Sequence, residues 1–218
     1  PKGILMLVEN NPVWRDVRVR QEAQSLKDAG YAVSVICPGM AGRRFHEEMD
    51  GIHIFTYPPP YQGRGFIGYA YEYGYSLLAM FLVSLYVFVR RGFDIIHAAN
   101  PPDTAVLIAI FYKIFGRQFV YDHHDLSPEV FSLRFGSEKG IARLVYGILV
   151  FLERLSCRVA DHVIATNQSY KNIELQRGKI PESKITIVRN GPDLERHRRV
   201  ELPPELRREG QTTNVHLG

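Results

Sequence analysis

The stretch that decides the fold is Gln118-Phe119-Val120-Tyr121-Asp122-His123-His124-Asp125-Leu126-Ser127-Pro128-Glu129. Its first part is a strand-like apolar run, and the run ends in the densest ionisable cluster of the chain. The Ser-Pro pair then indicates a turn. A parallel strand that ends in such a cluster delivers side chains to the carboxyl edge of a sheet, where open α/β sheets bind ligands. We therefore expect the chemistry of this protein here.

A purely structural interpretation of the cluster stays open on spacing alone. His123 can be a packed histidine, and Asp122 and Asp125 can cap the following turn. Glu129 can be a solvated charge in a first helical turn. The rest of the chain has to decide between these interpretations.

Strand-like and helix-like segments alternate on both sides of this stretch. Further strands are predicted at 4–8, 31–37, 52–57, 94–98, 162–166 and 184–188, and helices at 13–29, 66–89, 100–115, 141–159 and 168–177. The first strand is apolar on successive residues, which is typical of a strand buried on both faces. The alternation predicts a doubly wound α/β domain with a mostly parallel sheet.

Composition bounds the class of protein. The chain has 218 residues, of which 45% are hydrophobic and 23% charged, so it can bury a core without a disulfide or a metal. Cys37 and Cys157 lack metal-ligand spacing and are expected to be reduced thiols of a cytoplasmic protein. The start of the chain reads as a strand and not as a signal peptide.

The charge balance favours some partners over others. The net charge is +4, and many arginines precede the middle of the chain. Each arginine taken singly is consistent with a solvated surface. Together they suit a phosphate-bearing ligand or an anionic membrane surface better than a nucleic acid, because no recognised nucleic-acid module is present.

The apolar segment 66–89 raises the question of a membrane span. Its uninterrupted part, 77–89, is shorter than the roughly 20 residues that a bilayer needs, and Glu72 lies upstream. We therefore expect a mostly buried helix of a soluble domain. Its tyrosines and the terminal Arg90-Arg91 leave an interfacial role open.

Polar residues follow nearly every predicted strand. The strand exits are Glu9, Asn10, Pro38-Gly39, Tyr57, His97 with Asn100, Asp122 to Asp125, Thr166-Asn167 and Asn190-Gly191. This gathering predicts a binding cleft at one edge of the sheet. No Gly-x-Gly-x-x-Gly or P-loop motif supports a dinucleotide or P-loop site. No metal is expected, since neighbouring histidines on a strand point to opposite faces.

The composition changes after residue 193. Residues 194–213 are charged and rich in proline, which predicts a linker, and 214–218 read as the opening of another strand. We therefore expect a domain over 1–193, a linker over 194–213 and the start of a truncated carboxy-terminal donor-binding domain at 214–218.

Four motifs carry a resemblance to a known family: Asp94-Ile95-Ile96-His97-Ala98-Ala99-Asn100-Pro101-Pro102-Asp103, the run from Val120 to Glu129, Ile164 to Tyr170, and Ile187 to Asp193. In this order they resemble the amino-terminal domain of retaining glycosyltransferases of family 4, the group 1 type. The resemblance implies a GT-B enzyme of two facing Rossmann-like domains. The amino-terminal domain mainly binds the acceptor, the other mainly binds the nucleotide-sugar donor, and no metal or other cofactor is needed. The fragment alone would be inactive.

The resemblance also implies roles for individual residues. His124 would contact the transferring sugar or its phosphate, while Asp125 would orient it or bind acceptor hydroxyls. The residues expected to bind acceptor or donor are Asn10, Arg15, Asp16, His97, Asn100, His123, Glu129, Asn167, Asn190 and Gly191. Where many members carry a glycine pair in the first loop, this chain has Glu9-Asn10-Asn11-Pro12.

Three other interpretations remain at this stage. The chain can be a GT-B relative of the epimerase or phosphorylase type, or a non-catalytic sugar- or nucleotide-binding module. With a lipid-linked acceptor, the enzyme can also associate peripherally with the inner face of the membrane.

Overall fold

A computed structural model describes residues 1–60, 65–136, 139–189 and 191. Its centre is an eight-stranded sheet of order β3-β4-β2-β1-β5-β6-β7-β8. The strands are β1 (Gly3–Leu7), β2 (Ala32–Pro38), β3 (His46–Met49), β4 (Ile52–Tyr57), β5 (Ile95–Ala99), β6 (Gln118–His123), β7 (His162–Ala165) and β8 (Ile185–Ile187). All neighbours pair in parallel except β3 and β4, so the doubly wound, mostly parallel α/β sheet is confirmed.

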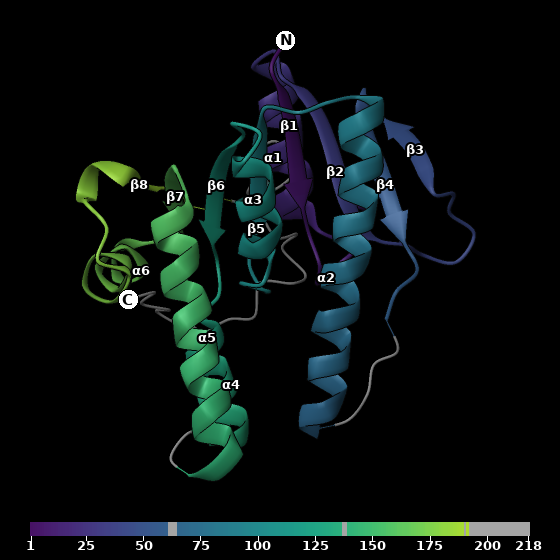
Figure 1. Ribbon diagram of the computed structural model, residues 1–218. Helices are drawn as coiled ribbons and strands as arrows, with labels where there is room; N and C mark the ends of the chain where they lie inside the picture. The colour runs from purple at the N-terminus through teal and green to yellow at the C-terminus, as the bar shows by residue number, and fades with distance from the viewer. Residues whose placement is uncertain (61–64, 137–138, 190, 192–218) are drawn as a thin grey trace, which may run out of the picture.

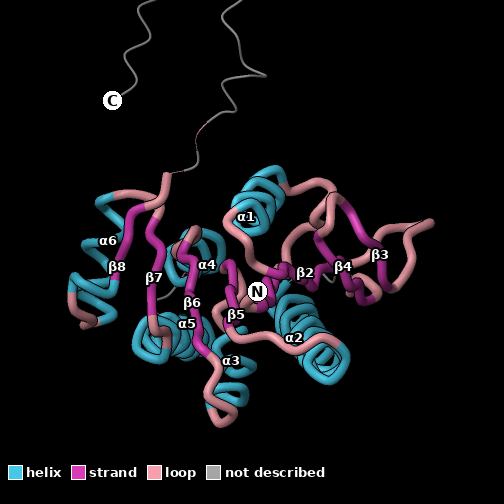
Figure 2. The backbone as a smooth tube through the Cα atoms, turned by 90° about the horizontal axis from the view of Figure 1, so that it is seen from above, coloured by secondary structure: helices cyan, strands magenta, loops and turns pink. Residues whose placement is uncertain are grey.

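Helices cover both faces of this sheet (Figures 1 and 2). They are α1 (Val17–Asp28), α2 (Gly65–Arg90), α3 (Ala105–Lys113), α4 (Ser127–Phe135), α5 (Gly140–Val159) and α6 (Gln168–Ile173). Helices α2, α3 and α5 lie on one face, and α1 lies on the other. Helix α4 and the first turns of α2 and α5 extend beyond the carboxyl edge of the sheet (Figure 1).

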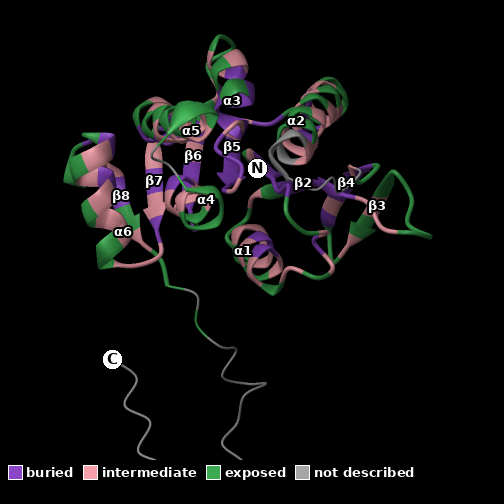
Figure 3. Cartoon of the chain, turned by 90° about the horizontal axis from the view of Figure 1, so that it is seen from below, coloured by how far each residue is buried: buried purple, intermediate pink, exposed green. Residues whose placement is uncertain are grey.

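Strand alternation divides the interior into two cores. Leu5 and Leu7 of β1 point to the core under α2, α3 and α5, whereas Ile4 and Met6 point to the core under α1. Both sets are buried, and β5 beside them is mostly purple in Figure 3. A strand buried on both faces has no polar alternation, as the sequence of β1 predicts.

The sheet has an additional strand that hydrophobic patterning missed. Strand β3 has the sequence His-Glu-Glu-Met and pairs antiparallel with β4 at the edge. Its His46 ring stacks on Phe55 with centroids 4.4 Å apart, and Glu47 pairs with Arg43. Charged residues are common on edge strands because they discourage pairing with other chains.

Two helical segments differ from the expectation. The Ser-Pro pair begins a helix, α4, with proline in its first turn, where its missing N–H is no loss. The segment predicted as one helix to Arg177 changes at Glu174 into η1 (Glu174–Gly178), a π-helical turn. A short 3-10 turn, Glu182–Lys184, then precedes β8.

Helix α2 is less buried than expected. Within Ala70–Arg90, which is long and apolar enough to cross a membrane by length and composition alone, 28% of the most apolar window is buried. Met80, Ser84 and Val87 form part of its buried stripe, while Leu78 and Val89 are exposed. The expectation of a mostly buried helix is therefore wrong.

Strand order places the cluster after β6 next to a topological switch. From β1 the chain proceeds outward through β2 and β4, and it then crosses to β5 and continues through β6 to β8. The reversal lies between β1 and β5, where open α/β sheets form a crevice. The register pairs Ala99 of β5 with Asp122 of β6, so the polar exits of both strands lie side by side.

Candidate active site

One carboxylate holds two histidine rings at the end of β6. Oδ2 of Asp122 lies 2.5 Å from Nε2 of His124 and 3.3 Å from Nε2 of His97. Asp122 is 0% exposed and His124 is 8% exposed. Alternation helps to explain the grouping, because Asp122 shares a face of β6 with Val120, and the register pairs Val120 with His97.

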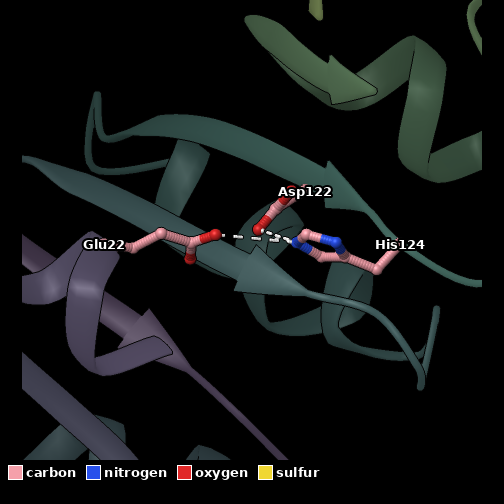
Figure 4. A group of neighbouring side chains, drawn as sticks. All are labelled: Glu22, Asp122 and His124. Carbon is pink, nitrogen blue, oxygen red and sulfur yellow. Dashed lines mark hydrogen bonds and ion pairs between the residues drawn. The ribbon is translucent and has the colours of Figure 1, made fainter. Parts of the chain in front are cut away.

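A fourth side chain joins the cluster from α1, the helix that connects β1 and β2. Oε1 of Glu22, on α1, lies 3.7 Å from Nε2 of His124 (Figure 4). Within the described part of the chain, Nδ1 of His124 makes no hydrogen bond. His124 is therefore held at one ring nitrogen, Nε2, by Asp122.

Burial and mutual charge set the ionisation of this cluster. Burial alone would raise the pKa of Asp122, but hydrogen bonds from His124 and His97 lower it well below its usual range. Burial alone would lower the pKa of His97, but the hydrogen bond and charge of Asp122 raise it. Burial and the charge of Asp122 raise the pKa of Glu22. Asp122 is thus the fixed negative charge of the cluster.

Asn100 holds the loop that presents His124. Its Oδ1 accepts the backbone N–H groups of His124 at 2.6 Å and Asp125 at 3.0 Å. Its Nδ2 donates to the Asp125 carbonyl at 2.6 Å and to Oδ1 of Asp103 at 3.1 Å. Asn100 is buried, so the structure gives it a positioning role behind the loop.

The cluster also has the composition of a possible metal site. Single ligand atoms of Glu22, Asp122 and His124 lie within 4.8 Å of one another. Two carboxylates and one imidazole are ligands that several divalent metals accept. However, Oδ2 of Asp122 is already hydrogen-bonded to both histidines, which satisfies it without an ion. The expectation of no metal stays a prediction.

His123 belongs to a separate network in the interior. Its Nδ1 lies 3.1 Å from Oε1 of Glu174, and its Nε2 lies 3.7 Å from Oε2 of Glu153. Its ring stacks on Tyr121 with centroids 5.2 Å apart. The ring is 0% exposed, so the structure places His123 among packing residues and away from the face of His124.

Glu129 joins this second network through Arg177. The Arg177 guanidinium binds both carboxylate oxygens of Glu129 and both of Glu153. Glu129 lies on α4, Glu153 on α5 and Arg177 on η1. Arg177 therefore ties three elements together, and the predicted binding residue Glu129 is one of its two partners.

The remaining predicted residues lie at or near the rim in different roles. Asn10, Arg15 and Gly191 are exposed, and Asn190 lies outside the described residues. Asp16 caps α1 by accepting the Val19 N–H at 3.2 Å. Asn167 caps α6 by accepting the N–H groups of Ser169 and Tyr170 at 2.9 and 3.1 Å. These caps account structurally for two residues that the resemblance assigned to binding.

Asp125 points elsewhere than expected. It is exposed, and the side chain that orients His124 is Asp122. Asp125 instead lines a cavity of about 420 Å³ bounded by α2, α4, α5 and the residues before α3. Binding of acceptor hydroxyls by Asp125 remains a prediction.

The exit of β1 holds another buried carboxyl group. Glu9 accepts a hydrogen bond from the Ser76 hydroxyl of α2 at 2.9 Å. Burial raises the pKa of Glu9 to about 7, against the lowering effect of this hydrogen bond. Glu9 is thus a rim residue that titrates near neutral pH.

Sequence reasoning missed Glu22 and did not name Asp122 as the partner of the His124 ring. Glu22 occupies an ordinary helical position, and no sequence signal distinguishes it from a solvated charge. The role of Asp122 was accessible, because residues two apart on a strand share a face. The same rule predicts that His123 and His124 face opposite sides, and their separate partners agree with it.

Comparisons with known proteins agree with this geometry. The sequence model of Glycosyltransferase Family 4 matches residues 16–196. No curated protein sequence matches the chain. The chain is also similar to solved structures of low sequence identity.

Three solved structures illustrate the likeness. Sucrose-phosphate synthase from Thermosynechococcus elongatus has a TM-score of 0.64 at 15% identity, over 89% of this chain and 49% of that chain. UGT2 of Phytolacca americana, complexed with UDP-2fluoro-glucose and pterostilbene, has a TM-score of 0.57 at 9% identity, over 87% and 54%. The UDP-GlcNAc 2-epimerase of Methanocaldococcus jannaschii has a TM-score of 0.52 at 12% identity, over 85% and 45%.

The chain spans about half the length of these three proteins, and at such identities the likeness concerns the fold. The fold is the Rossmann-like α/β fold of GT-B glycosyltransferases. The family match covers most of the chain, including every residue of the Asp122 cluster. The chain therefore belongs to glycosyltransferase family 4.

Proposed function

We propose that this chain is the acceptor-binding domain of a retaining glycosyltransferase that takes a sugar from a nucleotide-sugar donor. The acceptor is a glycan, a lipid-linked molecule or a small molecule. The observation that carries the proposal is the ring of His124, held by Asp122 at the carboxyl edge of a family 4 domain.

The geometry suits a reaction in which charge separates. Glycosyl transfer develops negative charge on the departing diphosphate and positive charge on the sugar, so the site needs a placed proton donor and a nearby anion. The ionised Asp122 fixes the Nε2–H of His124, which leaves Nδ1 for the sugar or its phosphate. When the ring is protonated, Nδ1 donates to phosphate, and Asp122 stabilises the imidazolium.

The test is replacement of His124 in the enzyme that contains this domain. His124→Ala should lower turnover at least tenfold while the domain still folds, which circular dichroism checks. Some loss of melting temperature is expected, because buried Asp122 loses its hydrogen bond from the His124 ring. His162→Ala is the matched control, since its ring contacts Thr186 between two strands far along the sheet. Near-normal turnover of His124→Ala would remove this histidine from the mechanism.

The donor is expected to bind mainly outside this chain. We propose that residues 1–193 form the acceptor-side domain and that a second Rossmann-like domain supplies most donor contacts, without a metal or cofactor. The UDP-sugar in the related UGT2 structure and the half-length coverage support this division. A panel of nucleotide-sugars should bind a form extended by a second domain, and tight binding by the 218-residue chain alone would contradict the division.

Two features support a proposal on where the protein acts. Cys37 and Cys157 are both buried, and burial raises the pKa of Cys37 to about 11, so we propose that they remain reduced thiols in the cytoplasm. Helices α2, α3 and α5 expose large apolar side chains beside basic ones. We propose that this helical face associates peripherally with the inner face of an anionic membrane.

A further inference from the structure

The cavity between α2, α4 and α5 has two chemically different ends. We propose that it binds the apolar chain of an amphiphilic acceptor, with the acceptor's hydroxyl-bearing head at the end nearest Asp125. This inference rests on the proposed glycosyltransferase function and narrows its acceptor to a molecule that carries an alkyl or isoprenoid chain.

The wall of the cavity is mostly hydrocarbon. Its apolar lining comes from three helices and includes Leu77 of α2, Val130 and Phe131 of α4, and Ile148 and Leu152 of α5. The volume of about 420 Å³ lies within the roughly 300–1,000 Å³ of ligand pockets. Such a wall favours a chain over a free sugar, since burial of hydrocarbon is what it can stabilise.

The other end of the cavity gathers polar atoms without partners. Oδ2 of Asp103, Oγ1 of Thr104 and Oγ of Ser127 are all buried, and none has a hydrogen bond within the described part of the chain. All three residues line this cavity. Buried polar atoms are rarely left unpaired, so three of them at one end indicate a ligand that carries hydroxyl groups. Asp103 itself is 3% exposed and is held through Oδ1 by Tyr121 at 2.5 Å.

Asn100 links this polar end to the loop that carries His124. Asn100 donates to Asp103 and to the carbonyl of Asp125, and it accepts the N–H of His124. Asp125 lines the cavity, while its neighbour His124 faces the other side of the same loop. An acceptor anchored by its chain would therefore place its head beside the loop that presents His124.

Direct binding tests this inference without the donor. The probes are glycerol and its butyl, hexyl and octyl ethers, titrated below their micelle concentrations into the 218-residue chain by calorimetry. If the alkyl chain of the ether enters the cavity, each added methylene should tighten binding by up to about fourfold. Affinity that does not change with chain length would overturn the proposal.

Two variants test separately where the alkyl chain and the hydroxyl-bearing head of the ether bind. Gly74 lines the cavity and has nothing within 4 Å of the position of a Cβ, so Gly74→Leu fills space without a clash and should remove the dependence on chain length. Gly147→Leu is the matched control, because Gly147 is also open but lies outside this cavity. Thr104→Val removes one unpaired hydroxyl and should weaken all the ethers by about the same factor, roughly fivefold for one hydrogen bond.

The outcomes separate this inference from the proposed function. Equal loss of affinity in the Gly74→Leu and Gly147→Leu variants would overturn the placement of the alkyl chain in this cavity. Sugar transfer that depends on His124 and proceeds to a free sugar, with no binding of the octyl ether, would overturn the amphiphilic acceptor and leave the glycosyltransferase function standing.

Discussion

At the scale of residues, two neighbouring histidines at the end of β6 have different surroundings. His124, just after the strand, contacts Asp122 and Glu22, whereas His123 contacts Glu174 and Tyr121 in the interior. The end of β6 thus places one imidazole in the Asp122 cluster and the next one in the packed interior. Strand alternation alone accounts for this division.

Glu9 gives a residue-scale prediction about pH. Its pKa is raised by burial from 4.5 to about 7, so between these values the unfolded chain releases a proton that the folded domain keeps. The stability from neutral Glu9 is complete below pH 4.5 and is lost as the pH rises through 7. Glu9→Gln should therefore match the wild type at pH 4.5 and exceed it at pH 8 by about 1–3 kcal/mol.

Urea unfolding at both pH values measures this difference. The amide oxygen of the variant can still accept the Ser76 hydroxyl, so the substitution removes the charge and keeps the hydrogen bond. The same stability difference at pH 4.5 and pH 8 would show that Glu9 does not titrate in this range.

The sequence predicts which residues lie at the site better than it predicts which side chains contact one another there. His124, Asp125, His97 and Asn100 were placed at adjacent strand exits, and the parallel register does bring these exits together. Asn100 could not be recognised as a clamp, because its four hydrogen bonds depend on the path of a loop. Glu22 reaches His124 from a helix far along the chain, and helical periodicity says nothing about that contact.

At the scale of elements, Arg177 ties α4, α5 and η1 through two glutamates. A regular helix to Arg177 was expected, and the π-helical turn adds one residue to that turn. Within this turn Glu174 faces His123 and Arg177 faces Glu153. No periodicity in the sequence encodes such a local change in helical pitch.

Arg177→Met should destabilise the domain by about 3 kcal/mol, because Glu153 would remain buried without its cation. Adding Glu153→Gln should restore a large part of that loss. Thermal or urea unfolding of the single and double variants measures the coupling. Strictly additive effects would show that the ion pair does not hold these elements together.

Strand β3 and helix α4 show which elements patterning misses. Both are short, and neither has a clear apolar period: β3 is charged and α4 begins with Ser-Pro. The long elements were predicted because burial imposes a regular pattern on them. Elements at the edge or rim of the sheet need no regular apolar pattern, because they contact solvent on more sides.

At the scale of the whole molecule, the two faces of the sheet differ in character. Helices α2, α3 and α5 carry five basic residues, Arg90, Lys113, Arg143, Arg154 and Arg158, and their acidic residues are Glu72 and the buried Glu153. Their exposed apolar side chains include Leu78, Leu82, Leu107, Leu144 and Phe151. Apolar and basic groups together suit an anionic interface.

Vesicle binding gives the prediction at this scale. The chain should cosediment with vesicles that contain phosphatidylserine, and binding should fall as salt is raised. Arg143→Glu, on α5, should weaken binding about fivefold or more. Arg20→Glu, on α1, makes the same change in net charge on the opposite face and should have little effect. Equal losses would indicate net charge rather than this face, and no binding at low salt would exclude the association.

The alternation within β6 also limits how this family member can change over evolutionary time. Substitutions can adjust either face of the strand separately, because residues 122 and 124 share one face and residues 121 and 123 share the other. A single-residue insertion or deletion inside the strand would exchange the two faces at once and would turn His123 outward and His124 into the core. Evolutionary change within β6 must therefore occur by substitution of residues and not by insertion or deletion.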